Sequence, residues 1–251
     1  MNIKLLSIDL SNYCSKQCSF CYNHGTKKGN VMWLPDEIIS LAKDCADNGI
    51  EAISLGGGEP FEYDGVFQII DSLQPLVYLS VTTNGLPLLQ NKIWDKLLLH
   101  QPDKVHITIH QSDQEEEVDR VEMQLKELAK TKIKPGLNLL VSNQKIEACK
   151  QVYQRMIKFL HPDQIILVPQ RYANTPTPKE LAHVTGGKPF QSPACLLECQ
   201  RPTEFCSVSW DKKVNSCSYA GGKQPLCTFD YRGLVDALEK VTFIGCTSLK
   251  K

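Results

Sequence analysis

Residues 3–21, IKLLSIDLSNYCSKQCSFC, join a predicted β-strand to a loop that carries three cysteines. Aliphatic side chains dominate residues 3–10, which is typical of a strand. Cys14, Cys18 and Cys21 then follow with the spacing C-x3-C-x2-C. Three thiolates so close together can bind three irons of a cubic four-iron cluster. We therefore expect a metal centre in the loop after the first strand.

The fourth ligand separates two kinds of metal centre. The nearest further cysteine, Cys45, lies within a predicted helix, so no fourth thiol is close in the sequence. An iron–sulfur cluster would then keep one iron open to an external ligand, as a cluster that binds substrate does. Zinc prefers four protein ligands, and His24 could supply the fourth. Spacing alone leaves both centres open.

Strands and helices alternate from residue 3 to residue 168, which indicates about six βα units. Further strands are expected at residues 52–55, 76–83, 104–110, 136–141 and 164–168, and helices at residues 35–49, 66–74, 91–100, 114–130 and 145–160. We therefore expect an α/β protein, with an incomplete (βα)6 barrel over residues 1–170. An irregular connector over residues 171–194 and a small cysteine-rich extension over residues 195–251 complete the expected organisation.

Two of the expected strands have one polar face. In residues 104–110, His106, Thr108 and His110 alternate with aliphatic side chains. In residues 76–83 the same alternation places serine, threonine and tyrosine opposite leucine and valine. A barrel whose helices cover the apolar side and whose polar side lines a site explains this pattern. An edge strand that faces water explains it equally well for either strand alone.

Two short motifs follow the second and third strands. Residues 56–60 read GGGEP, and residues 82–85 read TTNG. Glycines allow a backbone to approach a ligand closely. Loops at the carboxyl ends of parallel strands are the usual place for ligands in α/β proteins. Both motifs are therefore expected at the same end of the sheet as the cysteine loop.

The cysteine motif with Phe20 before its last cysteine, followed by GGGEP and TTNG, resembles the radical S-adenosylmethionine (radical SAM) enzymes over residues 3–170. The resemblance implies that Cys14, Cys18 and Cys21 bind a [4Fe-4S] cluster whose fourth iron is chelated by S-adenosylmethionine. It implies that the backbone of Gly57, Gly58 and Glu59 lines the methionyl amino group and that Phe20 lies near the adenine. Asn84, Thr108 and Asn138 are assigned to the same cofactor pocket.

The resemblance also implies a reaction. An external one-electron reductant of the flavodoxin or ferredoxin type reduces the cluster, and S-adenosylmethionine is cleaved to a 5′-deoxyadenosyl radical that abstracts hydrogen from substrate. Such an oxidoreductase would act on a peptide, with a separate recognition protein, or on a small metabolite. Arg171 is a candidate for binding a substrate carboxylate or phosphate. A non-catalytic iron–sulfur or zinc carrier is the alternative from another class of protein.

The C-terminal region holds a second group of cysteines. Residues 205–219, FCSVSWDKKVNSCSY, are expected to form a hairpin around residues 211–212. This region resembles the twitch and SPASM extensions of the same family, which bind auxiliary clusters; the glycine expected in the turn is Lys212 here. Cys206 shares a face with apolar residues and ranks low as a ligand. A second [4Fe-4S] cluster, a zinc site or buried thiols are the alternatives, and the ligands favoured for a metal are Cys195, Cys199, Cys217 and Cys227.

The composition excludes several classes of protein. The 251 residues include 28 basic and 28 acidic side chains, so the net charge of zero gives no reason to expect nucleic-acid binding. No apolar run approaches the ~20 residues of a membrane-spanning helix. Asp9 comes too early to leave room for a secretory signal. We expect a cytoplasmic protein without a membrane partner, in which clustered cysteines favour metals over disulfides.

Overall fold

The computed structural model of the chain describes residues 2–192 and 198–246 and contains one sheet in the order β6-β5-β4-β3-β2-β1-β7-β8-β9. From β6 through β1 to β7, every neighbouring pair is parallel. The strands span Leu5–Asp9 (β1), Ala52–Gly56 (β2), Tyr78–Thr83 (β3), Lys104–Ile109 (β4), Lys134–Val141 (β5), Ile165–Pro169 (β6), Phe205–Val208 (β7), Lys213–Asn215 (β8) and Gln224–Pro225 (β9). The expected α/β fold with a parallel sheet is confirmed.

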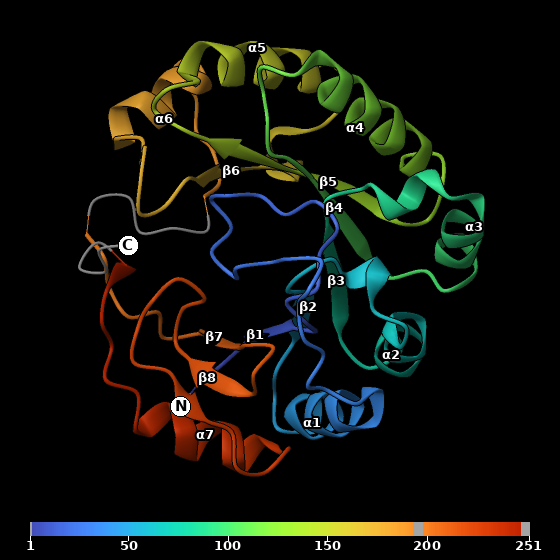
Figure 1. Ribbon diagram of the computed structural model, residues 1–251, viewed down its shortest axis with the longest axis vertical. Coiled ribbons are helices and arrows are strands. Elements are labelled where there is room, and N and C mark those ends of the chain that lie inside the picture. The colour runs from blue at the N-terminus through green and yellow to red at the C-terminus, as the bar shows by residue number, and fades with distance from the viewer. Residues whose placement is uncertain (1, 193–197, 247–251) are drawn as a thin grey trace.

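Helices cover the outer, convex side of the curved sheet (Figure 1). The α-helices span Pro35–Asp47 (α1), Val66–Leu73 (α2), Asn91–Leu99 (α3), Glu115–Leu128 (α4), Ile146–Met156 (α5), Pro178–Val184 (α6) and Tyr231–Glu239 (α7). Short 3-10 helices span Pro60–Glu62 (η1), Pro87–Leu89 (η2) and Pro162–Gln164 (η3). None of the helices in the described ranges is long and apolar enough to cross a membrane.

The two strands with one polar face lie inside the sheet. β3 and β4 pair with each other and each has a further parallel neighbour, so the edge-strand explanation of their pattern is wrong. Val105, Ile107 and Ile109 of β4 are fully buried in the core that includes the helices. Their polar neighbours Thr108 and His106 therefore face the concave side of the sheet.

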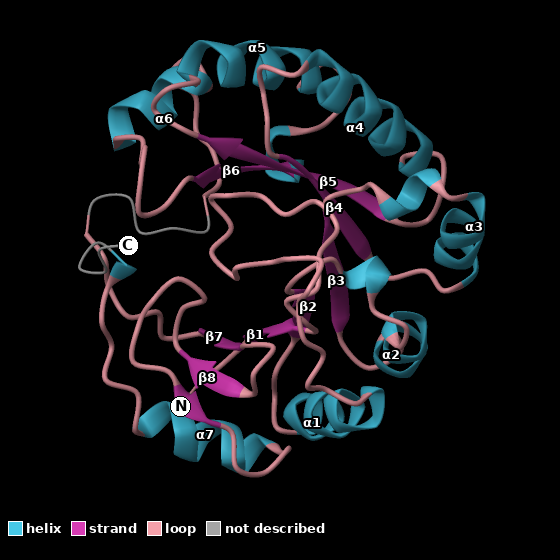
Figure 2. Ribbon diagram, in the orientation of Figure 1, coloured by secondary structure: helices cyan, strands magenta, loops and turns pink. Residues whose placement is uncertain are grey.

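The C-terminal region continues this sheet. β7 pairs in parallel with β1, and β8 and β9 follow as antiparallel strands. Figure 2 shows the resulting arc, which runs from β6 through β1 to the β7–β8 hairpin. The expected hairpin is confirmed, and Lys212 in its turn has a φ of 57°. That left-handed conformation suits glycine best, which explains the glycine that the related pattern has there.

The expectation of an irregular connector is wrong for residues 178–184, which form α6. Thr177 caps this helix, because its hydroxyl accepts a hydrogen bond from the Glu180 amide at 3.2 Å. The Glu180 carboxylate accepts one in return from the Thr177 amide at 2.7 Å. This capping box, with Pro178 in the first turn, was a visible helix signal in a proline-rich stretch.

Candidate functional site

The cysteine loop follows β1 and lies within the arc of strands (Figure 1). Cys14, Cys18 and Cys21 are all half-buried. A Cβ added at Gly25 would lie 3.1 Å from Cys14 Cβ and 3.6 Å from Cys21 Sγ, so one backbone position packs against both residues. Burial raises the pKa of Cys18 to about 11; the Lys16 ammonium lowers it and the other two thiols raise it further. The structure therefore brings the three predicted ligands together.

The arrangement of the thiols bears on the kind of metal that they suit. Within residues 2–192 and 198–246, no three His, Cys, Asp or Glu side chains converge on a position for a single metal ion. Zinc would need such convergence, and the proposed fourth zinc ligand, His24, is exposed. Thiolates around a cubic cluster bind different irons and do not converge on one. Three thiols in one loop match the ligand set of a cubic cluster, in which each thiolate binds its own iron.

The glycine-rich loop is locked against the start of the cysteine loop. The Gly58 amide donates to the Ser11 carbonyl at 2.7 Å, and the Glu59 amide donates to the Tyr13 carbonyl at 2.9 Å. A Cβ at Gly58 would lie 1.9 Å from the Tyr13 oxygen, so no other residue fits there without displacement. Gly57 also has a φ of 113°. These glycines permit the close approach of two backbones.

Glu59 joins the glycine-rich loop to the TTNG turn. Its buried carboxylate accepts hydrogen bonds from the Thr83 hydroxyl at 2.7 Å and from the Asn84 amide at 2.8 Å. Burial raises the pKa of Glu59 to about 7, while these hydrogen bonds oppose the rise. The Asn84 side-chain amide then donates to Cys14 Sγ at 3.6 Å. The three sequence motifs thus form one connected structure.

The interior strands place further predicted residues on the concave face of the sheet. Thr108 on β4 lies directly opposite Asn138 on β5 in the parallel register. His106, one step nearer the amino end of β4, is buried, and burial lowers its pKa to about 4. Its Nδ1 atom is buried without a hydrogen-bond partner. Uncharged imidazole and polar side chains therefore line this part of the concave face.

A tether between the cysteine loop and α4 was not predicted from the sequence. Glu117 lies in the first turn of α4; its side chain is 8% exposed and pairs with Lys16 of the loop at 2.7 Å. Burial opposes its ionisation, but hydrogen bonds from His110 and Lys16 lower the pKa of Glu117 to about 2. The Phe20 ring stacks on the His110 ring with centroids 6.1 Å apart. Two residues of the loop are thus fixed beside the end of β4.

Two other acids hold the loop. The Glu62 carboxylate accepts from the Ser15 amide at 2.9 Å, and Asp9 accepts from the Tyr22 hydroxyl at 3.2 Å. Asp9, the last residue of β1, is 4% exposed, and burial raises its pKa to about 6. A polar residue that ends a strand just before a ligand loop was the available sequence signal for Asp9.

The C-terminal cysteines divide into separate groups. Burial raises the pKa of the Cys246 thiol, and the nearby Arg171 guanidinium lowers it. The Cys199 and Cys217 thiols raise it further, because they lie close enough to interact with Cys246. Cys227 is exposed and donates a long hydrogen bond to the Pro225 carbonyl at 3.9 Å. Cys246, which sequence analysis left out of its favoured ligands, thus belongs with two of them.

The other cysteines are placed as follows. Cys206 is buried beside Cys45 in the core, in agreement with its low ranking as a ligand. Cys149 is also fully buried and lies 3.3 Å from the Ser112 hydroxyl. Cys195 lies outside the described residues.

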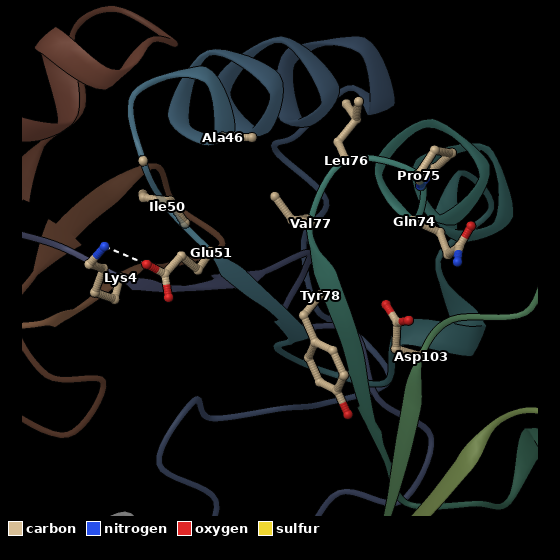
Figure 3. A pocket seen from close by; sticks show the side chains of 11 residues that line it. Lys4, Ala46, Ile50, Glu51, Gln74, Pro75, Leu76, Val77, Tyr78 and Asp103 are labelled. Carbon is tan, nitrogen blue, oxygen red and sulfur yellow. Dashed lines mark hydrogen bonds and ion pairs between the residues drawn. The ribbon is translucent and has the colours of Figure 1, made fainter.

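A groove at the other end of the sheet lacks these features. It lies at the amino ends of β1 to β4, where Lys4 pairs with Glu51 and the Tyr78 ring lines the opening (Figure 3). Cysteines are absent from its lining. The candidate site therefore lies at the carboxyl ends of the strands, as in other α/β proteins.

Three cysteines thus lie beside a glycine-rich loop at the carboxyl ends of a curved, mainly parallel sheet. The family model described as the radical SAM superfamily matches residues 8–150, more than half of the chain. The chain therefore belongs to the radical SAM superfamily, whose members use an iron–sulfur cluster and S-adenosylmethionine.

Curated relatives match part of the chain. A protein of Sulfurisphaera tokodaii named "Probable GTP 3′,8-cyclase" is 30% identical over 156 residues, which cover 58% of this chain and 49% of that protein. A protein of Methanocella arvoryzae with the same name is 35% identical over 83 residues, covering 33% of this chain and 27% of that protein. The chain thus spans about half or less of the length of these relatives.

Solved structures share the fold at low sequence identity. Streptococcus suis SuiB bound to precursor peptide SuiA has a TM-score of 0.71 at 14% identity, covering 86% of this chain and 59% of that one. Native anSMEcpe with bound AdoMet and the Cp18Cys peptide has a TM-score of 0.68 at 16% identity, covering 96% and 82%. These similarities confirm the fold.

Proposed function

We propose that the chain binds a [4Fe-4S] cluster through Cys14, Cys18 and Cys21 and uses it with S-adenosylmethionine to oxidise or rearrange a substrate. The observation that carries the proposal is the connection from Cys14 Sγ through Asn84 to Glu59. It fixes the thiols, the glycine-rich loop and the TTNG turn in one place. A cluster held by Cys14, Cys18 and Cys21 would pass one electron from an external reductant to S-adenosylmethionine, whose cleavage to methionine and a 5′-deoxyadenosyl radical would allow hydrogen abstraction from substrate.

The chain's own residues would bind S-adenosylmethionine and keep water away from it. Gly57, Gly58 and Glu59 are assigned to the methionyl end of the cofactor through their backbone, and Phe20 to the adenine. Thr108 and Asn138, side by side on the concave face, are assigned to the same pocket. The buried carboxylate of Glu59 acts as a positioning group, because its oxygens already accept hydrogen bonds from the protein.

The proposed substrate is a peptide or a small metabolite. Two proteins with this fold were solved with peptides bound. A nucleotide is the second candidate, because several relatives are named as probable GTP 3′,8-cyclases. Those relatives match only 33–58% of this chain, so the likeness says less about the substrate. A non-catalytic iron–sulfur carrier would not need the locked glycine-rich loop.

A second cluster is proposed at the C-terminal cysteines, with Cys199, Cys217 and Cys246 among its ligands. The supporting observation is their proximity to one another and to the Arg171 guanidinium. A cationic guanidinium favours thiolates and the net negative charge of a thiolate-bound cluster. Such a cluster would bind substrate or accept an electron from it.

Product analysis tests the proposal. The anaerobically reconstituted protein, reduced with dithionite, should release 5′-deoxyadenosine from S-adenosylmethionine, whereas a carrier should release none. Neighbouring genes would supply candidate precursor peptides, and GTP should be assayed beside them for a cyclised product. If GTP accelerates 5′-deoxyadenosine formation and none of the candidate peptides does, the nucleotide candidate is favoured.

A further inference from the structure

Residues 24–34, which we call the outer segment, place an exposed apolar run directly after the cysteine loop. Val31, Met32 and Leu34 are 54%, 50% and 64% exposed, while Trp33 between them is buried. Single exposed apolar side chains are ordinary, but three within four residues favour an interaction surface. Lys27 and Lys28 precede this run and are both exposed.

The outer segment is bonded to the backbone that carries the thiols. The Cys14 amide donates to the Thr26 carbonyl, and the Thr26 amide donates to the Asn12 carbonyl, each at 3.0 Å. The Asn30 amide donates to the Asn12 side chain at 2.6 Å. Gly29 packs so closely that an added Cβ would lie 2.3 Å from the Asn12 oxygen. Thr26, Gly29 and Asn30 of the outer segment thus pack directly on the backbone that leads into Cys14.

The charge on this surface is positive. Among the described residues, neither the Lys27 nor the Lys28 ammonium has an acidic partner. Of the acids that follow in sequence, Glu37 pairs with Lys212 at 2.7 Å, whereas Asp36 accepts from the neutral Gln68 amide at 2.9 Å and keeps its charge. The chain as a whole is neutral, so this local excess of positive charge is a property of the segment.

We infer that the outer segment docks the one-electron donor and that this donor is an acidic carrier protein. The inference rests on the proposed function, because only a cluster at Cys14, Cys18 and Cys21 would require a donor here. The lysines would attract an acidic partner over several ångströms, and the apolar run would exclude water at the contact. Electron transfer requires close approach, and this segment is the exposed backbone bonded to the thiol-bearing loop.

Two reductants separate docking from catalysis. Lys27→Glu/Lys28→Glu should raise the concentration of reduced flavodoxin that half-saturates 5′-deoxyadenosine formation by about tenfold at low salt. The rate with dithionite, a small reductant that needs no docking surface, should stay unchanged. Met32→Ser should raise the half-saturating flavodoxin concentration by about threefold. The dependence of that concentration on salt should stay as in the wild type. Direct titration of flavodoxin binding to the reconstituted protein supplies a readout independent of turnover.

Lys132→Glu/Lys158→Glu is the matched control, because both lysines are exposed at connections that lead into the amino ends of β5 and β6. It should leave both reductant assays unchanged. Unaltered flavodoxin dependence in Lys27→Glu/Lys28→Glu would overturn the docking surface alone. Equal loss with both reductants would also overturn it, since the segment would then serve only the cysteine loop. Loss of binding to an acidic peptide substrate, with flavodoxin dependence intact, would reassign the surface to substrate. Failure of the wild type with dithionite would instead overturn the proposed function.

Discussion

The two cysteine groups of this molecule differ in what holds them. The first lies in one loop after β1. Backbone bonds from Gly58 and Glu59 to Ser11 and Tyr13 fix this loop, as does the ion pair between Lys16 and Glu117. The second gathers Cys199, Cys217 and Cys246 from segments far apart in the chain, around short strands. The first is therefore prepared by local structure, whereas the second depends on how the extension packs.

Loss of a ligand in the first group should have the largest effect. Cys18→Ala should reduce 5′-deoxyadenosine formation to background, because an open-site cluster has no spare protein ligand. Chromatographic assay after anaerobic reconstitution measures this loss. Turnover at the normal rate would contradict the assignment of the three thiols.

Cys149→Ala is the matched control, because Cys149 is a fully buried thiol remote in sequence from both groups. It should keep normal turnover and lose about 1 kcal/mol of unfolding free energy through the small cavity. A turnover loss as great as that of Cys18→Ala would show that the assay reports stability instead of ligation.

Iron content should show whether the two groups are independent. Two cubic clusters give about eight irons per chain, and replacement of Cys14, Cys18 and Cys21 by alanine should leave roughly half. Cys246→Ala should remove the other half, while Cys227→Ala should leave the iron unchanged. Iron near zero in the first variant, with zinc in its place, would refute the auxiliary cluster. If Cys227→Ala loses iron and Cys246→Ala does not, Cys227 is the ligand, as predicted from the sequence.

Sequence predicted the barrel well because its signals are local. Alternating polarity marked β3 and β4, and Pro35 together with Gly49 marked the ends of α1 within two residues. The three motifs were predicted at one end of the sheet because parallel strands share their carboxyl ends. Their direct bonding through Glu59 could not be predicted, since it depends on the approach of separate loops.

The missed features depend on contacts between distant segments. Glu117 stands among three consecutive glutamates, and only packing shows which one meets Lys16. The parallel pairing of β7 with β1 crosses almost 200 residues, so no local pattern announces it. Cys246 is remote from Cys217 in sequence and joins it only through folding. By contrast, α6 had a local capping signal.

Asp9 lies where the two regions meet and should make stability depend on pH. Burial raises its pKa from 3.8 to about 6, while Lys223 of the extension lowers it. The folded state therefore binds a proton more tightly than the unfolded chain between these values. Its contribution is most favourable below pH 3.8 and is lost as pH rises through 6.

Asp9→Asn should remove this dependence. Two pKa units correspond to roughly 3 kcal/mol of unfolding free energy. The thermal midpoint of Asp9→Asn minus that of the wild type should therefore be about 5 °C or more larger at pH 7.5 than at pH 4. Asn keeps an oxygen that can accept from Tyr22. Thermal unfolding at several pH values measures the difference, and parallel curves for the two proteins would show that Asp9 is not the source.

Lys212 should have the smallest effect, because its backbone and side chain act in opposite directions. Its φ of 57° is unfavourable for a residue with a Cβ. Its ammonium, however, pairs with Glu37 at 2.7 Å and lies 4.6 Å from the Phe229 ring centroid, joining the hairpin to α1. Lys212→Gly and Lys212→Ala both lose these contacts, but only alanine keeps the strained backbone. The unfolding free energy of Lys212→Gly should therefore be about 1 kcal/mol higher than that of Lys212→Ala. It should differ little from that of the wild type. Equal stability of the two variants in urea titrations would mean that the turn relaxes and that the left-handed backbone at residue 212 costs no stability.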